Sequence, residues 1–145
     1  MAQSIQELDH RVNAVRRLCE DVYESYNTPE YISPDPLELV LEYPDPADRE
    51  LAALICSSLA LGRVELILEA CRSVLSRFAR LREELEEASF AELQERFSGF
   101  VYRFFKRDEI ASFLFALGET LRREGSLERC FREGIRNGED DGTLV

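Results

Sequence analysis

The stretch from Leu51 to Leu61, LAALICSSLAL, is apolar or small at every position and carries no charge. It is too short for a bilayer span, which needs about 20 apolar residues. A helix that is apolar on nearly every side must be surrounded by other elements. We therefore expect a helix that begins at Pro46 and ends near Leu61 to form the centre of the fold, with Leu54 and Ile55 in the core.

Two Asp-Pro steps, Asp35-Pro36 and Asp45-Pro46, precede apolar runs in this region. An Asp side chain can accept hydrogen bonds from the free N–H groups of a first helical turn. Pro suits the next position because its missing N–H would have had no partner there and its φ already fits a helix. The two steps predict two helix starts, the first opening a short helix that ends near Glu42.

The N-terminal segment has the clearest helical period, with apolar or small residues at alternating steps of three and four: Ile5, Leu8, Val12, Val15, Cys19, Val22 and Tyr26. Its other side is charged. Ser4 and Glu7 have the spacing of a capping box. The pattern predicts a helix that lies on a core with one side in water.

Further apolar patterns of helical period predict helices over residues 64–78, 90–97, 108–124 and 127–133, with Ser89 and Glu92 as a capping box for the second. Residues 81–89 are polar and acidic, which predicts an extension or linker, and residues 100–107 are expected to be irregular or a single turn. No alternating run predicts a strand. The chain is therefore expected to be all-α, with six or seven helices in one domain over residues 1–136 and a loose polar tail over 137–145.

Composition limits the classes of function. The chain has 145 residues, 45% hydrophobic and 32% charged, as in a soluble globular protein, and a net charge of −11 argues against a general affinity for phosphate backbones. Polar and acidic residues interrupt the N-terminus, so we expect no secretion signal and a cytoplasmic location, without a membrane partner. The sequence contains no phosphate-binding glycine loop, no HExxH motif and no EF-hand pattern.

Candidate catalytic and metal-binding groups are few. The four cysteines, Cys19, Cys56, Cys71 and Cys130, are widely spaced, and with one His in the chain we expect buried free thiols and no metal site. Ser57-Ser58 lacks a GxSxG elbow and is expected to pack between helices. The acids of residues 83–87 form a charge run typical of a solvated face. We expect no catalytic residue and no cofactor.

The segment RFSGFVYRFFKR, residues 96–107, stands out because it is basic and aromatic within an acidic protein. Arg96, Arg103, Lys106 and Arg107 could pair with phosphates, and Phe100 and Tyr102 could stack on bases. The alternative is structural: the Phe side chains, which also include Phe97, Phe104 and Phe105, fill the core while the Arg side chains lie over acidic helices.

The run PDPLELVLEYPDPADRELAALICSSLALGRVELILEACRSVL resembles the N-terminal part of the prokaryotic domain-of-unknown-function 2400 family. Residues 26–29 (YNTP) and 100–104 (FVYRF) match further motifs, so that the resemblance covers most of residues 22–132. It implies an all-helical fold. Relatives in that family continue past the position of Val145, so the resemblance also implies that this chain is a fragment or a shortened relative. Such a chain could bind its missing C-terminal half or self-associate.

That family is distantly similar to the helix-hairpin-helix DNA glycosylase superfamily, a likeness at the level of the fold. A glycosylase of that kind has an LPGVG-type hairpin and a downstream catalytic Asp, which do not occur here. The resemblance therefore implies a non-catalytic helical module of a DNA-repair-like protein, in contact with nucleic acid through residues 96–107. The alternative is an acidic helical module for protein–protein interaction or oligomerisation, with no role in nucleic-acid binding.

Overall fold

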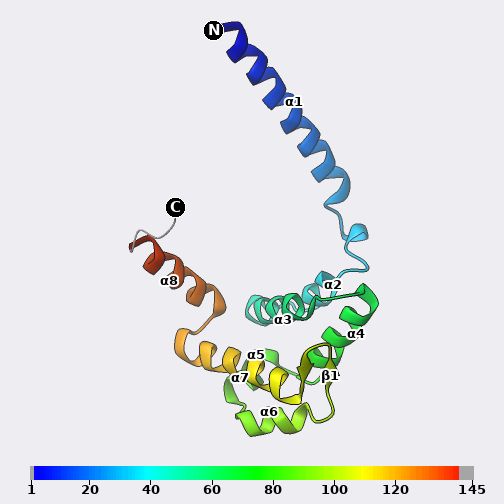
Figure 1. The fold of residues 1–145 in the computed structure, drawn as a ribbon, viewed down its shortest axis with the longest axis vertical. Coiled ribbons are helices and arrows are strands. Elements are labelled where there is room, and N and C mark those ends of the chain that lie inside the picture. Colours follow the sequence, from blue (N-terminus) through cyan, green and yellow to red (C-terminus); the bar gives the residue numbers. More distant parts are fainter. Residues whose placement is uncertain (1, 141–145) are drawn as a thin grey trace. The chain divides into compact units, whose positions relative to one another are not determined.

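The computed structural model describes the backbone of residues 2–140 and the side chains of residues 10–136 (Figure 1). The described residues form eight α-helices, one 3₁₀ turn and a two-stranded hairpin, which confirms the all-α fold class. The chain divides into two compact units, one up to Pro34 and the other from Asp35 on. The single domain expected over residues 1–136 stays a prediction.

The first unit contains helix α1 (Ala2–Tyr26) and the 3₁₀ turn η1 (Pro29–Tyr31). The helix begins before Ser4, so the capping box predicted for Ser4 and Glu7 is wrong: Ser4 lies inside the helix instead of preceding it. The predicted apolar stripe is present on α1, but between residues 10 and 34 of this unit no side chain is buried, so these residues form no core on which it could pack. From residue 10 on, the large apolar side chains of α1 are exposed.

The second unit begins with the two helices that the Asp-Pro steps predicted, α2 (Leu37–Leu41) and α3 (Pro46–Leu59). Asp45 Oδ1 accepts hydrogen bonds from the N–H groups of Ala47 and Asp48, at 2.8 and 3.2 Å. Asp35 Oδ1 accepts one from the N–H of Leu37 at 2.8 Å. Both helix starts are therefore held by the predicted carboxylates.

Helix α3 contacts α2, α4, α5 and α8, but it is buried on one side only. Ile55 is fully buried, whereas Leu54 is half-buried and Ala53 is exposed. The expectation that Leu54 belongs to the core is therefore wrong, because a wholly apolar sequence does not reveal which side its neighbours cover. The Ser57 and Ser58 hydroxyls donate to the carbonyl oxygen of Leu54 within the same helix.

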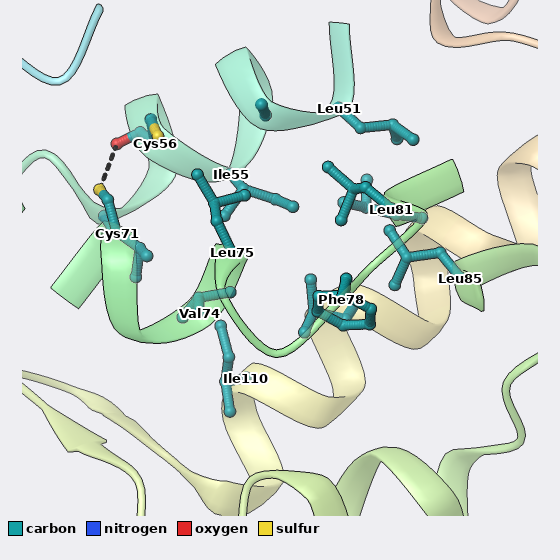
Figure 2. Close-up of a cluster of buried hydrophobic side chains, with 14 of the residues drawn as sticks. Leu51, Ile55, Cys56, Cys71, Val74, Leu75, Phe78, Leu81, Leu85 and Ile110 are labelled. Carbon is teal, nitrogen blue, oxygen red and sulfur yellow. Dashed lines mark hydrogen bonds between the residues drawn. The ribbon is translucent and has the colours of Figure 1, made fainter. Parts of the chain in front are cut away.

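The core is completed by five further helices: α4 (Val64–Leu75), α5 (Leu81–Glu87), α6 (Phe90–Arg96), α7 (Arg107–Glu124) and α8 (Leu127–Asp140). Figure 2 shows side chains of α3, α4, α5 and α7 meeting there, among them Ile55, Leu75, Leu85 and Ile110. Helix α7 packs against α5, α6 and α8, so it shares the centre of the fold with α3.

Two stretches are more regular than the sequence predicted. The acidic linker expected over residues 81–89 is mostly helix α5, whose Leu81 and Leu85 are buried. Helix α8 continues to Asp140, into the tail expected to be loose, and residues 141–145 of that tail lie outside the described part. The capping box of Ser89 and Glu92 is confirmed at the start of α6.

The segment after α6 forms an antiparallel hairpin of β1 (Val101–Tyr102) and β2 (Phe105–Lys106), where we expected no strand. Arg103 and Phe104 form its turn, with Arg103 in the left-handed region at φ 55°. Strands of two residues are too short to produce an alternating sequence pattern, and the turn lacks the Asn-Gly type of signal that marks most tight hairpins. The hairpin was therefore missed.

Candidate nucleic-acid interface

The hairpin and helix α4 enclose an open groove of about 520 Å³. Phe100, Tyr102 and Arg103 of the hairpin segment line it, together with Glu69 and Ser73 of α4 and Arg77 of the turn after α4. The structure thus brings together three of the six residues predicted to bind nucleic acid. The other three, Arg96, Lys106 and Arg107, do not line the groove.

Arg96, at the end of α6, is bound within the fold. Its Nη1 donates to the Glu84 carboxylate at 2.7 Å, and its guanidinium lies 4.7 Å from the centre of the Phe78 ring. Hydrogen bonds from the N–H of Arg80 and then from the Arg96 side chain lower the pKa of Glu84, against the opposing effect of burial. For Arg96 the structure matches the alternative in which Arg side chains lie over acidic helices.

Phe100 is also part of the fold. It is 7% exposed and meets Phe97 edge to face, with 5.7 Å between the ring centres. Phe97 is fully buried and contacts Phe78 in turn. Phe100 thus forms the floor of the groove and presents little ring surface to a ligand.

Arg107, the first residue of α7, is exposed but pairs with its neighbour Asp108, with 2.9 Å between Nε and Oδ1. Asp108 also accepts a hydrogen bond from the Gln94 side chain at 2.8 Å. The hydrogen bonds from Arg107 and then from Gln94 lower the pKa of Asp108. The charge of Arg107 is therefore partly neutralised where it stands.

Tyr102 and Arg103 fix the hairpin to the turn that follows α3. The Tyr102 hydroxyl donates to the carbonyl oxygen of Leu61 at 2.9 Å. The Arg103 guanidinium lies directly against the Cα of Gly62, where any Cβ would overlap it. Gly62 also has a φ of +122°, a conformation that glycine adopts without strain. The hairpin is therefore joined to this turn by one hydrogen bond and by a close contact at Gly62.

The outer surface of the hairpin, the hairpin patch, consists of Val101, Arg103, Phe104 and Lys106. Phe104 is 78% exposed and Val101 is 70% exposed. Among the described side chains, no carboxylate forms an ion pair with Arg103 or Lys106. The carboxylate of Glu109 accepts a hydrogen bond from the backbone N–H of Lys106 at 3.0 Å.

Phe104 was not among the residues predicted to stack on bases, which were Phe100 and Tyr102. The structure divides the Phe residues of this segment: Phe97 and Phe100 are buried, Phe105 is half-buried and Phe104 is exposed. Phe104 is exposed because a residue in a two-residue hairpin turn has no neighbouring strand to cover it. The sequence holds no standard signal for this turn, so the exposure of Phe104 was not predicted. Val101 was missed because strands of two residues are too short to produce an alternating sequence pattern.

The described part of the chain shows neither a metal-binding cluster nor a membrane-spanning helix. Over its side chains no group of three or more His, Cys, Asp or Glu residues has the arrangement to hold a metal ion. None of the described helices is long and apolar enough to cross a membrane. The expectation of four buried thiols is wrong for two of them, since Cys19 is exposed and Cys130 is half-buried.

Comparison with known families gives one match. The family described as "Protein of unknown function (DUF2400)" matches residues 35–144, which include the groove and the hairpin patch. No curated protein and no solved structure matches the chain significantly.

Proposed function

The chain belongs to the DUF2400 family of proteins of unknown function, and we propose that it is a non-catalytic helical module that contacts single-stranded nucleic acid through the hairpin patch. One observation carries the proposal. The exposed ring of Phe104 lies in the same short hairpin as Arg103 and Lys106, two cations with no ion pair among the described side chains.

This combination has the chemistry that a single strand needs. An exposed aromatic ring can stack on an unpaired base, which contributes about 1–3 kcal/mol per base, and the neighbouring cations can pair with phosphates. The net charge of −11 opposes long-range attraction, so the contact is local and sensitive to salt. Arg96 and Phe100 are left out of the proposed contact because both are committed to the fold.

The setting of a DNA-repair-like protein belongs to the same proposal. It is supported by the distant, fold-level likeness of the family to the helix-hairpin-helix DNA glycosylases. In this setting the chain binds and positions, while chemistry is left to another part or partner. A cytoplasmic location completes the proposal.

A second function, protein–protein interaction, is favoured by a separate observation. Apolar side chains are exposed on and beside the groove: Leu61 is 53% exposed, Leu66 of α4 42%, and Val101 and Phe104 of the hairpin still more. Large apolar residues that gather at one place often mark a protein interface. An apolar partner would use Val101 and Leu66, whereas a nucleic acid would depend on Arg103 and Lys106.

Fluorescence anisotropy with labelled single- and double-stranded oligonucleotides across a salt series tests the proposal. We expect preference for the single strand, a loss of about 1–3 kcal/mol in Phe104→Ala, and a salt dependence reduced by about one unit of slope in Arg103→Glu. Phe131→Ala and Arg129→Glu make the same changes at exposed positions of α8 and should leave binding unchanged.

Two outcomes would overturn the proposal. The first is absence of binding near physiological salt. The second is binding that Arg103→Glu and Phe104→Ala leave as strong as in the unchanged protein. If Leu66→Ala and Val101→Ala instead weaken the capture of a protein partner, the second function replaces the first.

A further inference from the structure

The α4 side of the groove carries polar side chains that the proposed contact at the hairpin patch does not use. Four residues of α4 line the groove: Leu66, Glu69, Ala70 and Ser73. They recur at steps of three and four, which places them on one side of the helix. Glu69 and Ser73 are four residues apart and are therefore neighbours on that side. The volume of the groove, about 520 Å³, lies within the range of sites that hold small ligands.

Of the polar groups on this side, the Glu69 carboxylate is the one open to a ligand. Among the described side chains, no Lys or Arg forms an ion pair with Glu69. Arg77 is bound within the fold: its Nε donates to the carbonyl oxygen of Ser73 at 3.0 Å, and its guanidinium lies 4.8 Å from the centre of the Phe97 ring. The hydroxyl of Ser73 takes no part in that bond, and Ser73 is half-buried where it lines the groove.

The two sides of the groove differ in charge. Helix α4 contributes the Glu69 carboxylate, and the hairpin contributes the Arg103 guanidinium. A phosphate is attracted to the hairpin and repelled by Glu69. A strand whose backbone follows the hairpin patch therefore directs a base, which is uncharged, toward α4. Leu66 and Val101, 42% and 70% exposed, line the groove and offer apolar surface to the ring of that base.

We propose that the groove binds one unpaired guanine of the single strand, with Glu69 as the residue that selects it; this inference rests on the proposed function. The bases of single strands are commonly recognised at their Watson–Crick edge. On guanine this edge presents two adjacent donors, N1–H and the N2 amino group, beside the acceptor O6. A carboxylate accepts two parallel hydrogen bonds from such a pair of donors. The hydroxyl of Ser73, next to Glu69, donates to O6.

The other bases do not match a carboxylate in this way. Adenine and cytosine present one amino group beside a ring nitrogen that is itself an acceptor. Thymine and uracil present one N–H group between two carbonyl oxygens. From each of these edges Glu69 accepts a single hydrogen bond while it faces an acceptor, which disfavours the contact.

Fluorescence anisotropy of the full chain with short labelled strands tests the selection. The strands are oligothymidine and the same strand with one central thymine replaced by guanine, hypoxanthine or adenine. We expect the single guanine to strengthen binding about tenfold, the discrimination typical of a good bidentate contact. Hypoxanthine lacks the N2 amino group and should lose most of this gain, and adenine should give none.

Variants of α4 assign the effect to Glu69. Glu69→Gln should bind oligothymidine at least as tightly as the unchanged protein, since a negative charge is removed, and should lose the gain from guanine. Glu65→Gln is the matched control: it removes a carboxylate from the same helix at a position that does not line the groove, and it should keep the gain. Ser73→Ala should reduce the gain, because O6 then has no donor. Both glutamates are exposed, so neither change removes a buried contact.

The selection of guanine is overturned if the strand with guanine binds no more tightly than oligothymidine, or if Glu69→Gln keeps the gain. Neither result touches the proposed function, which stands as long as Arg103→Glu and Phe104→Ala weaken the binding of oligothymidine. Absence of binding to every strand overturns both. Guanosine monophosphate serves as a competitor: if it binds as tightly as the strand with guanine, the groove is a site for the free nucleotide and the assignment to a strand is wrong.

Discussion

The Cα of Gly118 lies so close to the carbonyl oxygen of Leu85 that a Cβ at position 118 would overlap that oxygen. The backbones of α5 and α7 are therefore in direct contact at the centre of the second unit. The backbone of Gly118 is helical, a conformation that any residue can adopt. Glycine is required here because there is no room for a side chain. This contact joins the acidic helix that was expected to be a linker to the longest helix of the unit.

Gly118→Ala should lower the free energy of unfolding by about 1–3 kcal/mol, because the methyl group forces α5 and α7 apart. Denaturant unfolding followed by circular dichroism measures the change. Gly134 of α8 offers a matched control, since a Cβ there meets nothing within 4 Å. Gly134→Ala should stabilise by up to about 1 kcal/mol, as Ala does in place of an exposed helical Gly. Equal effects at both positions would contradict the close contact.

Neighbouring residues of α3 should respond differently to truncation. Ile55→Ala should cost about 2–5 kcal/mol, because Ile55 is fully buried and its loss leaves a cavity. Leu54→Ala should cost less than about 2 kcal/mol, because Leu54 is half-buried and water can fill the space. Thermal or chemical unfolding of the two variants gives the order, and a larger loss for Leu54→Ala would show that the burial of α3 is assigned to the wrong side.

The stability of the protein should fall in acid partly through Glu84. Because hydrogen bonds from Arg80 and Arg96 lower the pKa of Glu84 in the folded protein, its ionised form stabilises the fold above the ordinary pKa of glutamate. That contribution disappears as the pH falls through the lowered pKa. The free energy of unfolding, measured from neutral to acidic pH, should therefore depend less on pH in Glu84→Gln than in the unchanged protein. The variant should be destabilised most near neutral pH, where Glu84 is ionised in the unchanged protein. Glu87→Gln, an exposed change on the same helix, should leave the profile unchanged.

The four thiols should react in two groups. Cys19 is exposed and Cys130 is half-buried, whereas Cys56 and Cys71 are buried between α3 and α4, where the Cys71 thiol donates to the Cys56 carbonyl oxygen at 3.9 Å (Figure 2). The neighbouring Cys71 thiol and then burial raise the pKa of Cys56, which disfavours its reactive thiolate. A thiol reagent should label two cysteines in the native protein and four after denaturation, as counted by mass spectrometry. Rapid labelling of all four would show that α3 and α4 do not pack as described.

The sequence predicted best what is decided locally. The Asp45 cap and the Ser89–Glu92 capping box depend on residues two or three positions apart, and both are present. Helix α5 was missed because its contacts are remote in the sequence: the Leu85 carbonyl oxygen packs against Gly118, which lies in another helix. The burial of α3 was misjudged because its sequence is apolar on all sides, while its neighbours cover one side.

The basic and aromatic segment could be recognised in the sequence, but which of its side chains are exposed could not. A basic and aromatic segment was visible, yet Arg96 and Arg103 were indistinguishable by composition. Their difference arises from distant partners, since Glu84 lies beside Arg96 and Gly62 lies beside Arg103. The exposure of Phe104 depends on a turn for which the sequence holds no standard signal.

The hairpin is held by its contact with the turn after α3, and its most exposed side chains take no part in that contact. A two-residue hairpin has little stability of its own, and the Tyr102 hydroxyl holds this one to the Leu61 carbonyl. Phe104 and Lys106 are exposed and support no other part of the described fold, so replacing them should change stability by no more than about 0.5 kcal/mol. The exposed side chains at the tip of the hairpin can therefore be replaced while the helices beneath it stay as they are.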